Sequence, residues 1–134
     1  MGLVIDTGVL IRVERSREVM DFNQWLEYGE AYLSAITCLE LLVGIHQANT
    51  AKRRVTRTAF VERLLADLPV LNFDLDTARV HAELLAAIPK NITVGAHDLI
   101  IGATAMRYGF ALLTTNAQEF RRMPGLAVLD FPGS

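Results

Sequence analysis

The chain has 134 residues, of which 51% are hydrophobic and 21% are charged. This composition excludes intrinsic disorder, and the length is that of one domain with its own core, so we expect a single domain over residues 1–134. Thirteen basic and 15 acidic side chains give a formal net charge of −2. A strongly basic coat for nucleic acids is therefore excluded, and any RNA or DNA contact must come from a local patch or a metal site.

In chain order, short apolar runs alternate with longer stretches of helical periodicity. The expected order is strand 2–5, helix 9–28, strand 31–35, helices 37–48 and 51–68, strand 70–73, helix 76–88, loop 89–95, helix 96–108, strand 110–113, a short helix after residue 116, and strand 126–129. Pro69 ends one helix and Gly109 another. This alternation predicts an α/β fold whose central, mainly parallel sheet of four or five strands is flanked by helices.

Cellular location is inferred from Cys38 and from the apolar runs. A single cysteine forms no internal disulfide, and Cys38 lies in an apolar stretch, where we interpret it as a small buried side chain. No run approaches the roughly 18 apolar residues of a membrane span. The first apolar run reaches Asp6 too soon for a secretory signal. We expect a cytoplasmic protein without a membrane partner.

Acidic side chains fall at one edge of the expected sheet. Asp6 ends the first strand, and Glu40 and Asp98 lie in the first turns of the helices 37–48 and 96–108. Asn116 and Glu119 follow the fourth strand. Because the carboxyl ends of parallel strands share one edge, we expect these side chains to meet there.

Each of these positions also has a purely structural interpretation. Acids near helix starts are favoured by capping and by the helix dipole, and residues 37–40 and 116–119 fit or resemble capping boxes. Asp74 and Asp76 follow a strand too, and we interpret both as helix caps. Several carboxylates in one crevice repel one another, however, unless a divalent cation is bound. Mg²⁺ and Mn²⁺ prefer carboxylate ligands, so the group as a whole favours a metal site.

Four segments carry a resemblance to a known family. They are residues 3–11 (LVIDTGVLI), 33–44 (LSAITCLELLVG), 98–105 (DLIIGATA) and 113–120 (LTTNAQEF). Their order and spacing resemble those of PIN-domain ribonucleases, and specifically of the VapC toxins of bacterial type II toxin–antitoxin systems. The resemblance covers essentially the whole chain. It implies a PIN-like (Rossmann-like) three-layer fold and an endoribonuclease activity that depends on Mg²⁺ or Mn²⁺.

The resemblance also implies roles for individual residues. Asp6, Glu40 and Asp98 match the acidic metal ligands of the family and, with Asn116, its catalytic positions. The family often has aspartate where this chain has Asn116, and an amide brings no charge. Either Asn116 or Glu119 is then the fourth ligand.

A second departure concerns Gly8, where the family often has serine or asparagine. A side-chain hydrogen bond near the metal is thereby lost, and the Thr7 hydroxyl is expected to supply the remaining one. We expect Thr7, Thr115 and Glu119 to support the ligands.

Partners are implied in the same way. The resemblance implies a small VapB-like antitoxin that blocks the site, operator DNA contacted only through that antitoxin, and tRNA or ribosomal RNA as substrate. Together with the high share of hydrophobic residues, 51% of the chain, the resemblance favours a homodimer. Basic side chains that we expect to contact RNA or antitoxin are Arg12, Arg15, Lys52, Arg53, Arg54 and Arg57.

Other functions remain open at this point. A receiver-like metal-binding regulatory domain would have an acidic pair at the first strand and a lysine after the last, whereas Ile5 precedes Asp6 and Lys90 is far from a strand end. A phosphatase of the haloacid dehalogenase type would have aspartate in place of Gly8. The three histidines lack zinc-ligand spacing. A PIN domain that binds without cleaving is compatible with Asn116.

Overall fold

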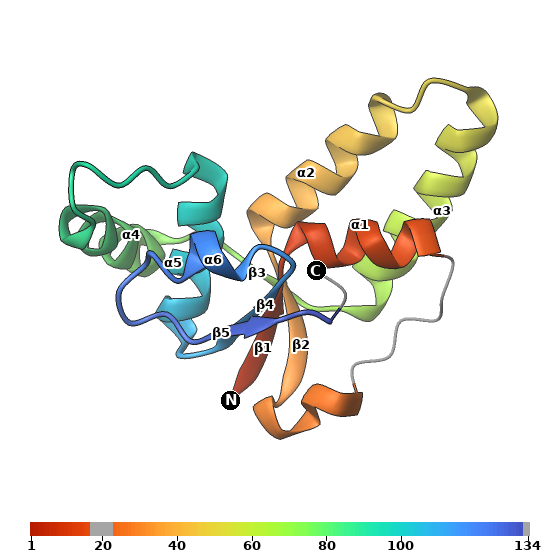
Figure 1. Ribbon diagram of the computed structural model, residues 1–134. Helices are drawn as coiled ribbons and strands as arrows, with labels where there is room; N and C mark the ends of the chain where they lie inside the picture. The colour runs from red at the N-terminus through yellow and green to blue at the C-terminus, as the bar shows by residue number, and fades with distance from the viewer. Residues whose placement is uncertain (17–22, 133–134) are drawn as a thin grey trace.

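The computed structural model describes residues 1–16 and 23–132. Within them, one five-stranded sheet has the order β3-β2-β1-β4-β5, and every pair of neighbouring strands is parallel (Figure 1). The strands are β1 (Gly2–Ile5), β2 (Glu30–Ser34), β3 (Val70–Leu71), β4 (Ala111–Thr114) and β5 (Val128–Asp130). The expected α/β fold with a parallel central sheet is confirmed.

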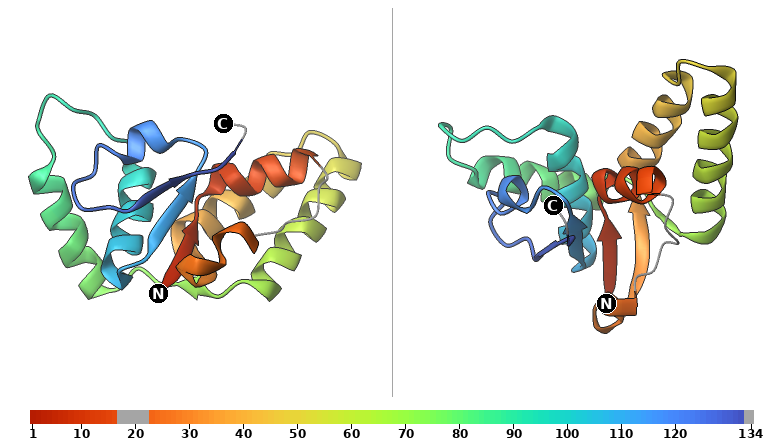
Figure 2. Two further views of the ribbon diagram at one scale, coloured as in Figure 1. Left: turned by 60° about the horizontal axis from the view of Figure 1, so that its bottom comes forward. Right: turned by 45° about the vertical axis from the view of Figure 1, so that its right-hand side comes forward.

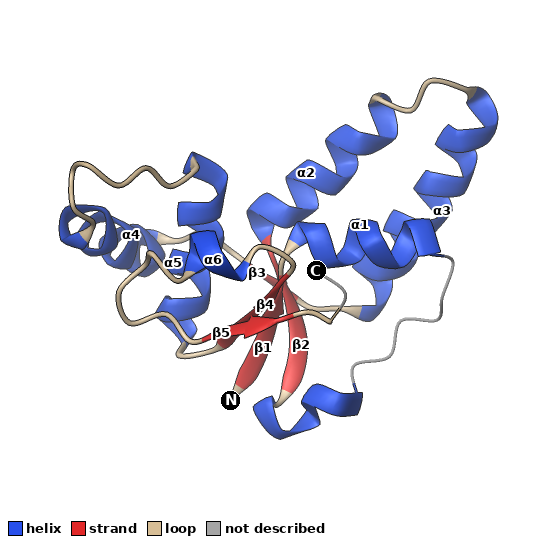
Figure 3. Ribbon diagram, in the orientation of Figure 1, coloured by secondary structure: helices blue, strands red, loops and turns tan. Residues whose placement is uncertain are grey.

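Helices cover both faces of this sheet and produce three layers (Figures 2 and 3). They are α1 (Thr7–Ser16), α2 (Ala35–His46) and α3 (Ala51–Asp67) on one face, and α4 (Leu75–Ala87), α5 (Ala96–Tyr108) and α6 (Ala117–Phe120) on the other. The hairpin of α2 and α3 extends beyond the carboxyl ends of the strands (Figure 1). No helix in the described ranges is both long and apolar enough to cross a membrane.

The central strand β1 is buried on both faces, which is why it is apolar throughout. Leu3 and Ile5 contact the core under α1, α2 and α3, whereas Val4 contacts the core under α4 and α5. All three side chains are at most 1% exposed. Strands covered on both sides give continuous apolar runs in place of alternation, and this pattern made β1 easy to predict.

The helix expected over residues 9–28 is wrong. Helix α1 ends at Ser16, and a separate 3-10 helix (η1, Asn23–Tyr28) follows; residues 17–22, including Phe22, lie outside the described residues. Because β2 is parallel to β1, the chain must return to the start of the sheet, and a 20-residue helix of about 30 Å would overrun it. Trp25 of η1 packs in the core, with its ring stacked on Phe131 at 5.6 Å.

The start of α2 also differs from the expectation. The helix begins at Ala35, and its cap is Ser34, whose Oγ accepts a hydrogen bond from the Thr37 backbone N–H at 3.2 Å. Thr37 is therefore not the cap, and Glu40 lies in the second turn of α2. The last residue of β2 is itself the cap, so no loop separates strand from helix. By contrast, Asp74 is confirmed as the cap of α4, since its carboxylate accepts from the Thr77 N–H at 2.9 Å. The same expectation for Asp76 is wrong, because Asp76 lies inside the first turn of that helix.

The edge strands are shorter than, or displaced from, their expected ranges. β3 ends at Leu71 rather than at residue 73, and β5 begins at Val128 rather than at residue 126. Each of these strands pairs with only one neighbouring strand. Fewer of their residues are therefore hydrogen-bonded in the sheet than the length of their apolar runs suggests.

Candidate active site

Asp6 lies immediately after β1, beside the end of β4. Its backbone N–H donates to the Leu113 carbonyl at 2.9 Å, its Oδ1 accepts from the Thr7 N–H at 2.8 Å, and its Oδ2 accepts from the Thr114 hydroxyl at 2.7 Å. The side chain is only 7% exposed. The chain builds the sheet to one side of β1 first and then to the other, so Asp6 lies at the topological switch point, where ligands of such sheets bind.

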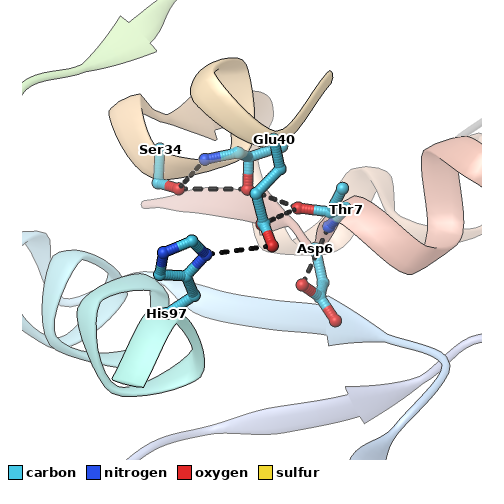
Figure 4. Close-up of polar contacts among 6 residues, drawn as sticks. Asp6, Thr7, Ser34, Glu40 and His97 are labelled. Atoms are coloured by element: carbon cyan, nitrogen blue, oxygen red, sulfur yellow. Dashed lines mark hydrogen bonds and ion pairs between the residues drawn. The ribbon is translucent and has the colours of Figure 1, made fainter. Parts of the chain in front are cut away.

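Glu40 is held from two sides (Figure 4). Its Oε1 accepts a hydrogen bond from the Thr7 hydroxyl at 2.7 Å, and its Oε2 lies 3.2 Å from Nδ1 of His97. Thr7 begins α1 and His97 lies in the first turn of α5. One carboxylate therefore joins three helices around the ends of β1 and β2.

Asp98 and Glu119 form a carboxyl pair, joined by a hydrogen bond between their side chains. Asp98 lies in the first turn of α5, as expected, and Glu119 is on α6. Glu119 also accepts from the Gly95 N–H at 3.2 Å and from Nδ2 of Asn116 at 2.9 Å. The amide of Asn116 thus contacts Glu119, and Asn116 itself is exposed.

The carboxyl groups influence one another's ionisation. Burial raises the pKa of Asp6, and the charges of Glu40 and Glu119 raise it further, against the hydrogen bonds from Thr114 and Thr7. Burial is also the largest cause that raises the pKa of Asp98 to about 8, followed by Glu119, Asp6 and Glu40. The hydrogen bond from Asp98 lowers the pKa of Glu119. The cluster therefore concentrates negative charge that a cation would relieve.

The donor set fits a hard divalent cation. Carboxylate oxygens from α2, α5, α6 and the end of β1 meet here, and Mg²⁺ and Mn²⁺ prefer such ligands. Among the residues that the structure describes, no three His, Cys, Asp or Glu side chains are placed so that they could hold a metal ion together. Glu40 is engaged by Thr7 and His97, and Glu119 by Gly95 and Asn116.

Thr115 lies above the first turn of α1. A Cβ added to Gly8 would lie 2.6 Å from Oγ1 of Thr115, so the glycine leaves room for this hydroxyl. Thr115 therefore stands beside the start of α1, next to the Thr114 that binds Asp6.

Four polar residues at the site were not assigned a role from the sequence. Thr114 binds Asp6, His97 contacts Glu40, Ser34 contacts Thr37, and Thr37 contacts Thr7. A usable signal was present for Ser34 and Thr114, because each is a hydroxyl residue at the end of a buried strand. His97 gave a signal as well, because it directly precedes Asp98 at the start of a helix. Thr37 gave none for its contact with Thr7, which is remote in sequence.

Four of the six candidate basic residues line one groove beside α1 and α3. These are Arg15, Lys52, Arg53 and Arg57, which share the groove with Glu14. An adjoining pocket, also lined by Arg15 and Arg57, reaches Glu40. Arg57 is tied in place by Glu14 at 3.4 Å and by the Gly44 carbonyl at 2.8 Å.

The other two candidates are not part of this groove. Arg54 lines a different surface of α3, with Val55 and Ala59, and donates to the Ala48 carbonyl. Arg12 is absent from the residues that line either pocket. The basic side chains of the groove that leads toward Glu40 are therefore Arg15, Lys52, Arg53 and Arg57.

The sheet, the switch point and the acidic cluster together define a nuclease domain. The family described as "PIN domain" matches residues 3–126. Ribonuclease VapC1 of Rickettsia felis is 38% identical over 130 residues, which is 96% of each chain. The tRNA(fMet)-specific endonuclease VapC of Salmonella typhimurium is 32% identical over 140 residues, covering 98% of each.

Solved structures agree with these sequences. The DNA-bound VapBC of Salmonella typhimurium superposes with a TM-score of 0.82 and 26% identity, over 97% of this chain and 98% of that one. VapBC2 of Rickettsia felis, bound to a promoter DNA fragment, shares the fold with a TM-score of 0.85 and 21% identity, over 98% and 99% of the chains. The chain belongs to the PIN-domain family, among its VapC ribonucleases, and is a nuclease hydrolase of this metal-dependent group.

Proposed function

We propose that this protein is a Mg²⁺- or Mn²⁺-dependent endoribonuclease toxin that cleaves tRNA or ribosomal RNA in the cytoplasm and thereby inhibits translation. The observation that carries the proposal is the carboxylate cluster at the switch point, where burial first, and then Glu119, Asp6 and Glu40, raise the pKa of Asp98 to about 8. Two relatives named tRNA(fMet)-specific endonucleases support RNA as the substrate.

A VapB-like antitoxin is the proposed partner, because related solved structures are VapBC complexes, among them the DNA-bound Salmonella complex. We propose that operator DNA is contacted only through that antitoxin. A homodimer remains a prediction.

Asp6, Asp98 and Glu40 are the residues that would hold the ion. We assign the fourth place to Glu119, because its carboxylate already bonds Asp98, whereas Asn116 presents its amide nitrogen to Glu119 and so orients it. When bound, the ion would neutralise phosphate charge and favour the ionised form of a nearby water.

The chain's own residues supply the rest of the chemistry. Three hydrogen bonds fix Asp6, so its carboxylate enters the reaction without reorganising. The Thr7 hydroxyl fixes Oε1 of Glu40, and Oε2, which lies 3.2 Å from Nδ1 of His97, is the oxygen that accepts the proton of an attacking water. In-line attack on the phosphodiester then leaves 5′-phosphate and 3′-hydroxyl ends.

Removal of the metal gives the direct test of this function. Purified protein treated with EDTA is expected to leave total cellular RNA uncut, and added Mg²⁺ or Mn²⁺ is expected to restore discrete cleavage. Gel analysis with mapping of the new 5′ ends measures both results. Equal cleavage with and without EDTA would contradict the metal-dependent reaction, and no cleavage at any metal concentration would favour a PIN domain that binds without cutting.

The basic groove gives a prediction about RNA affinity. Replacing Arg15, Lys52 and Arg53 together by alanine is expected to raise KM for RNA by roughly tenfold or more with little change in kcat, because cations beside phosphates contribute mainly to binding. The slope of log affinity against log salt should fall by about one for each removed side chain that binds a phosphate. Arg54→Ala is the matched control, since Arg54 lies on the same helix but on another surface. Equal increases of KM in the control and in the triple variant would contradict this role for the groove.

A further inference from the structure

A chain of buried hydroxyl groups connects the end of β2 with Glu40 (Figure 4). Oγ of Ser34 lies 3.1 Å from Oγ1 of Thr37, which lies 3.0 Å from Oγ1 of Thr7, which lies 2.7 Å from Oε1 of Glu40. Ser34 and Thr37 are 0% exposed and Thr7 is 8% exposed. The three residues come from β2, α2 and α1, so the chain crosses three elements within the core of the site.

The direction of this chain follows from counting protons. Each hydroxyl has one proton to donate. The proton of Thr7 goes to the Glu40 carboxylate, which is the nearer and stronger acceptor. Thr37 then donates to Thr7, and Ser34 donates to Thr37 while it accepts from the Thr37 backbone N–H. All donors therefore point toward Glu40, and aligned hydrogen bonds of this kind strengthen one another.

The Thr37 hydroxyl contacts the cap residue Ser34 of its own helix and also reaches Thr7 on another helix. Capping of α2 needs only the bond from the Thr37 backbone N–H to Ser34. A threonine that acts within its own helix bonds the carbonyl four residues earlier, as Thr104 does with Ile100 at 2.7 Å. Thr37 instead contacts Thr7 on another helix, at the point where Thr7 holds the carboxylate.

We propose that Thr37 is a positioning residue of the ribonuclease reaction. It orients the Thr7 hydroxyl, which fixes Oε1 of Glu40, while Oε2, beside Nδ1 of His97, is the working oxygen of that carboxylate. The inference rests on the proposed function, because it requires Glu40 to take part in the reaction. It adds a residue that contacts neither substrate nor metal and acts only through Thr7.

Thr37→Val tests this role, because it removes the hydroxyl and nearly keeps the shape. We expect kcat for RNA cleavage to fall roughly 10- to 100-fold, which is the usual effect of losing a group that orients a ligand, with KM within about twofold. The affinity for Mn²⁺, measured by titration calorimetry on the purified protein, should fall as well. Thr37→Ser keeps the hydroxyl and should restore most of both values.

Thr104→Val is the matched control. Thr104 is as buried as Thr37, at 1% exposed, but its hydroxyl bonds a backbone carbonyl on α5. Its loss should change the thermal unfolding midpoint and leave kcat and Mn²⁺ affinity unchanged. If the valine at position 37 prevents folding, Thr37→Ala is measured in its place, with the same expected loss of kcat.

The Glu40→Gln variant distinguishes a failure of the role of Thr37 from a failure of the proposed function. An inactive Glu40→Gln variant beside a Thr37→Val variant with parental kcat and Mn²⁺ affinity would overturn the role of Thr37 alone. Equal losses of kcat in Thr37→Val and Thr104→Val would overturn it too. Full activity of Glu40→Gln would instead contradict the proposed function. Loss of kcat in Thr37→Val, with rescue by serine, supports the inference.

Discussion

Replacing Asp6 or Asp98 by asparagine is expected to slow RNA cleavage by roughly a hundredfold or more. Loss of a group that only orients a metal ligand already lowers metal affinity or activity by about 10- to 100-fold, and loss of the ligand itself should cost more. The substitution keeps the shape but removes the negative charge that attracts a cation. The fold should persist. In Asp6→Asn the amide still accepts from the Thr7 N–H, and the Thr114 hydroxyl can rotate to accept from the amide nitrogen.

Asp76→Asn is the matched control for this experiment. Asp76 lies in the first turn of α4, as Asp98 does in α5, but it is exposed and pairs with Arg107 at 3.3 Å. Initial rates on a labelled RNA, with circular dichroism to confirm folding, should separate the control from both site variants. Parental rates in Asp6→Asn and Asp98→Asn, after contaminating nuclease is excluded, would reject the assignment of these ligands.

The second large effect concerns the stability of the metal-free protein. Folded Asp98 keeps its proton up to about pH 8, whereas the unfolded chain loses it near the ordinary pKa of 3.8. Between these values the folded state binds more protons than the unfolded state, so the free energy of unfolding falls as pH rises. Asp98→Asn removes this dependence. The variant should unfold at a midpoint a few degrees, roughly 3–8 °C, above the parent at pH 8.5 and close to it at pH 4.

Divalent metal should reverse that order. Mg²⁺ or Mn²⁺ that binds only the folded parent stabilises it by mass action, by about 2.7 kcal/mol at a hundred times the Kd. Thermal unfolding at pH 8.5 with and without metal measures this in both proteins. A variant that is less stable than the metal-free parent at pH 8.5, or that gains as much from the metal, would show that Asp98 is an ordinary helix-start acid.

The positions of Asp6 and Asp98 could be predicted from the sequence because they depend on topology alone. A residue at the end of a buried parallel strand, or at the start of the following helix, must lie at the carboxyl edge. Thr37 fits a capping box in sequence, and only the structure shows that Ser34 occupies the cap and that Thr37 contacts Thr7. Local patterns contain no information about such cross-element contacts.

Two further features depended on three-dimensional packing. The end of α1 at Ser16 follows from the return path to β2 and not from its own apolar periodicity. The separation of Arg54 from Lys52 and Arg53 depends on how α3 packs against α1 and α2.

The position of a bound ion tests the central claim most directly. Crystals soaked with Mn²⁺ and measured near the manganese absorption edge give an anomalous map that locates the ion independently of the protein atoms. We predict one strong peak within roughly 2.0–2.4 Å of carboxylate oxygens of both Asp6 and Asp98, with Glu40 bound to it directly or through a water. A protein that shows no manganese peak between these carboxylates at saturating Mn²⁺ would contradict the account.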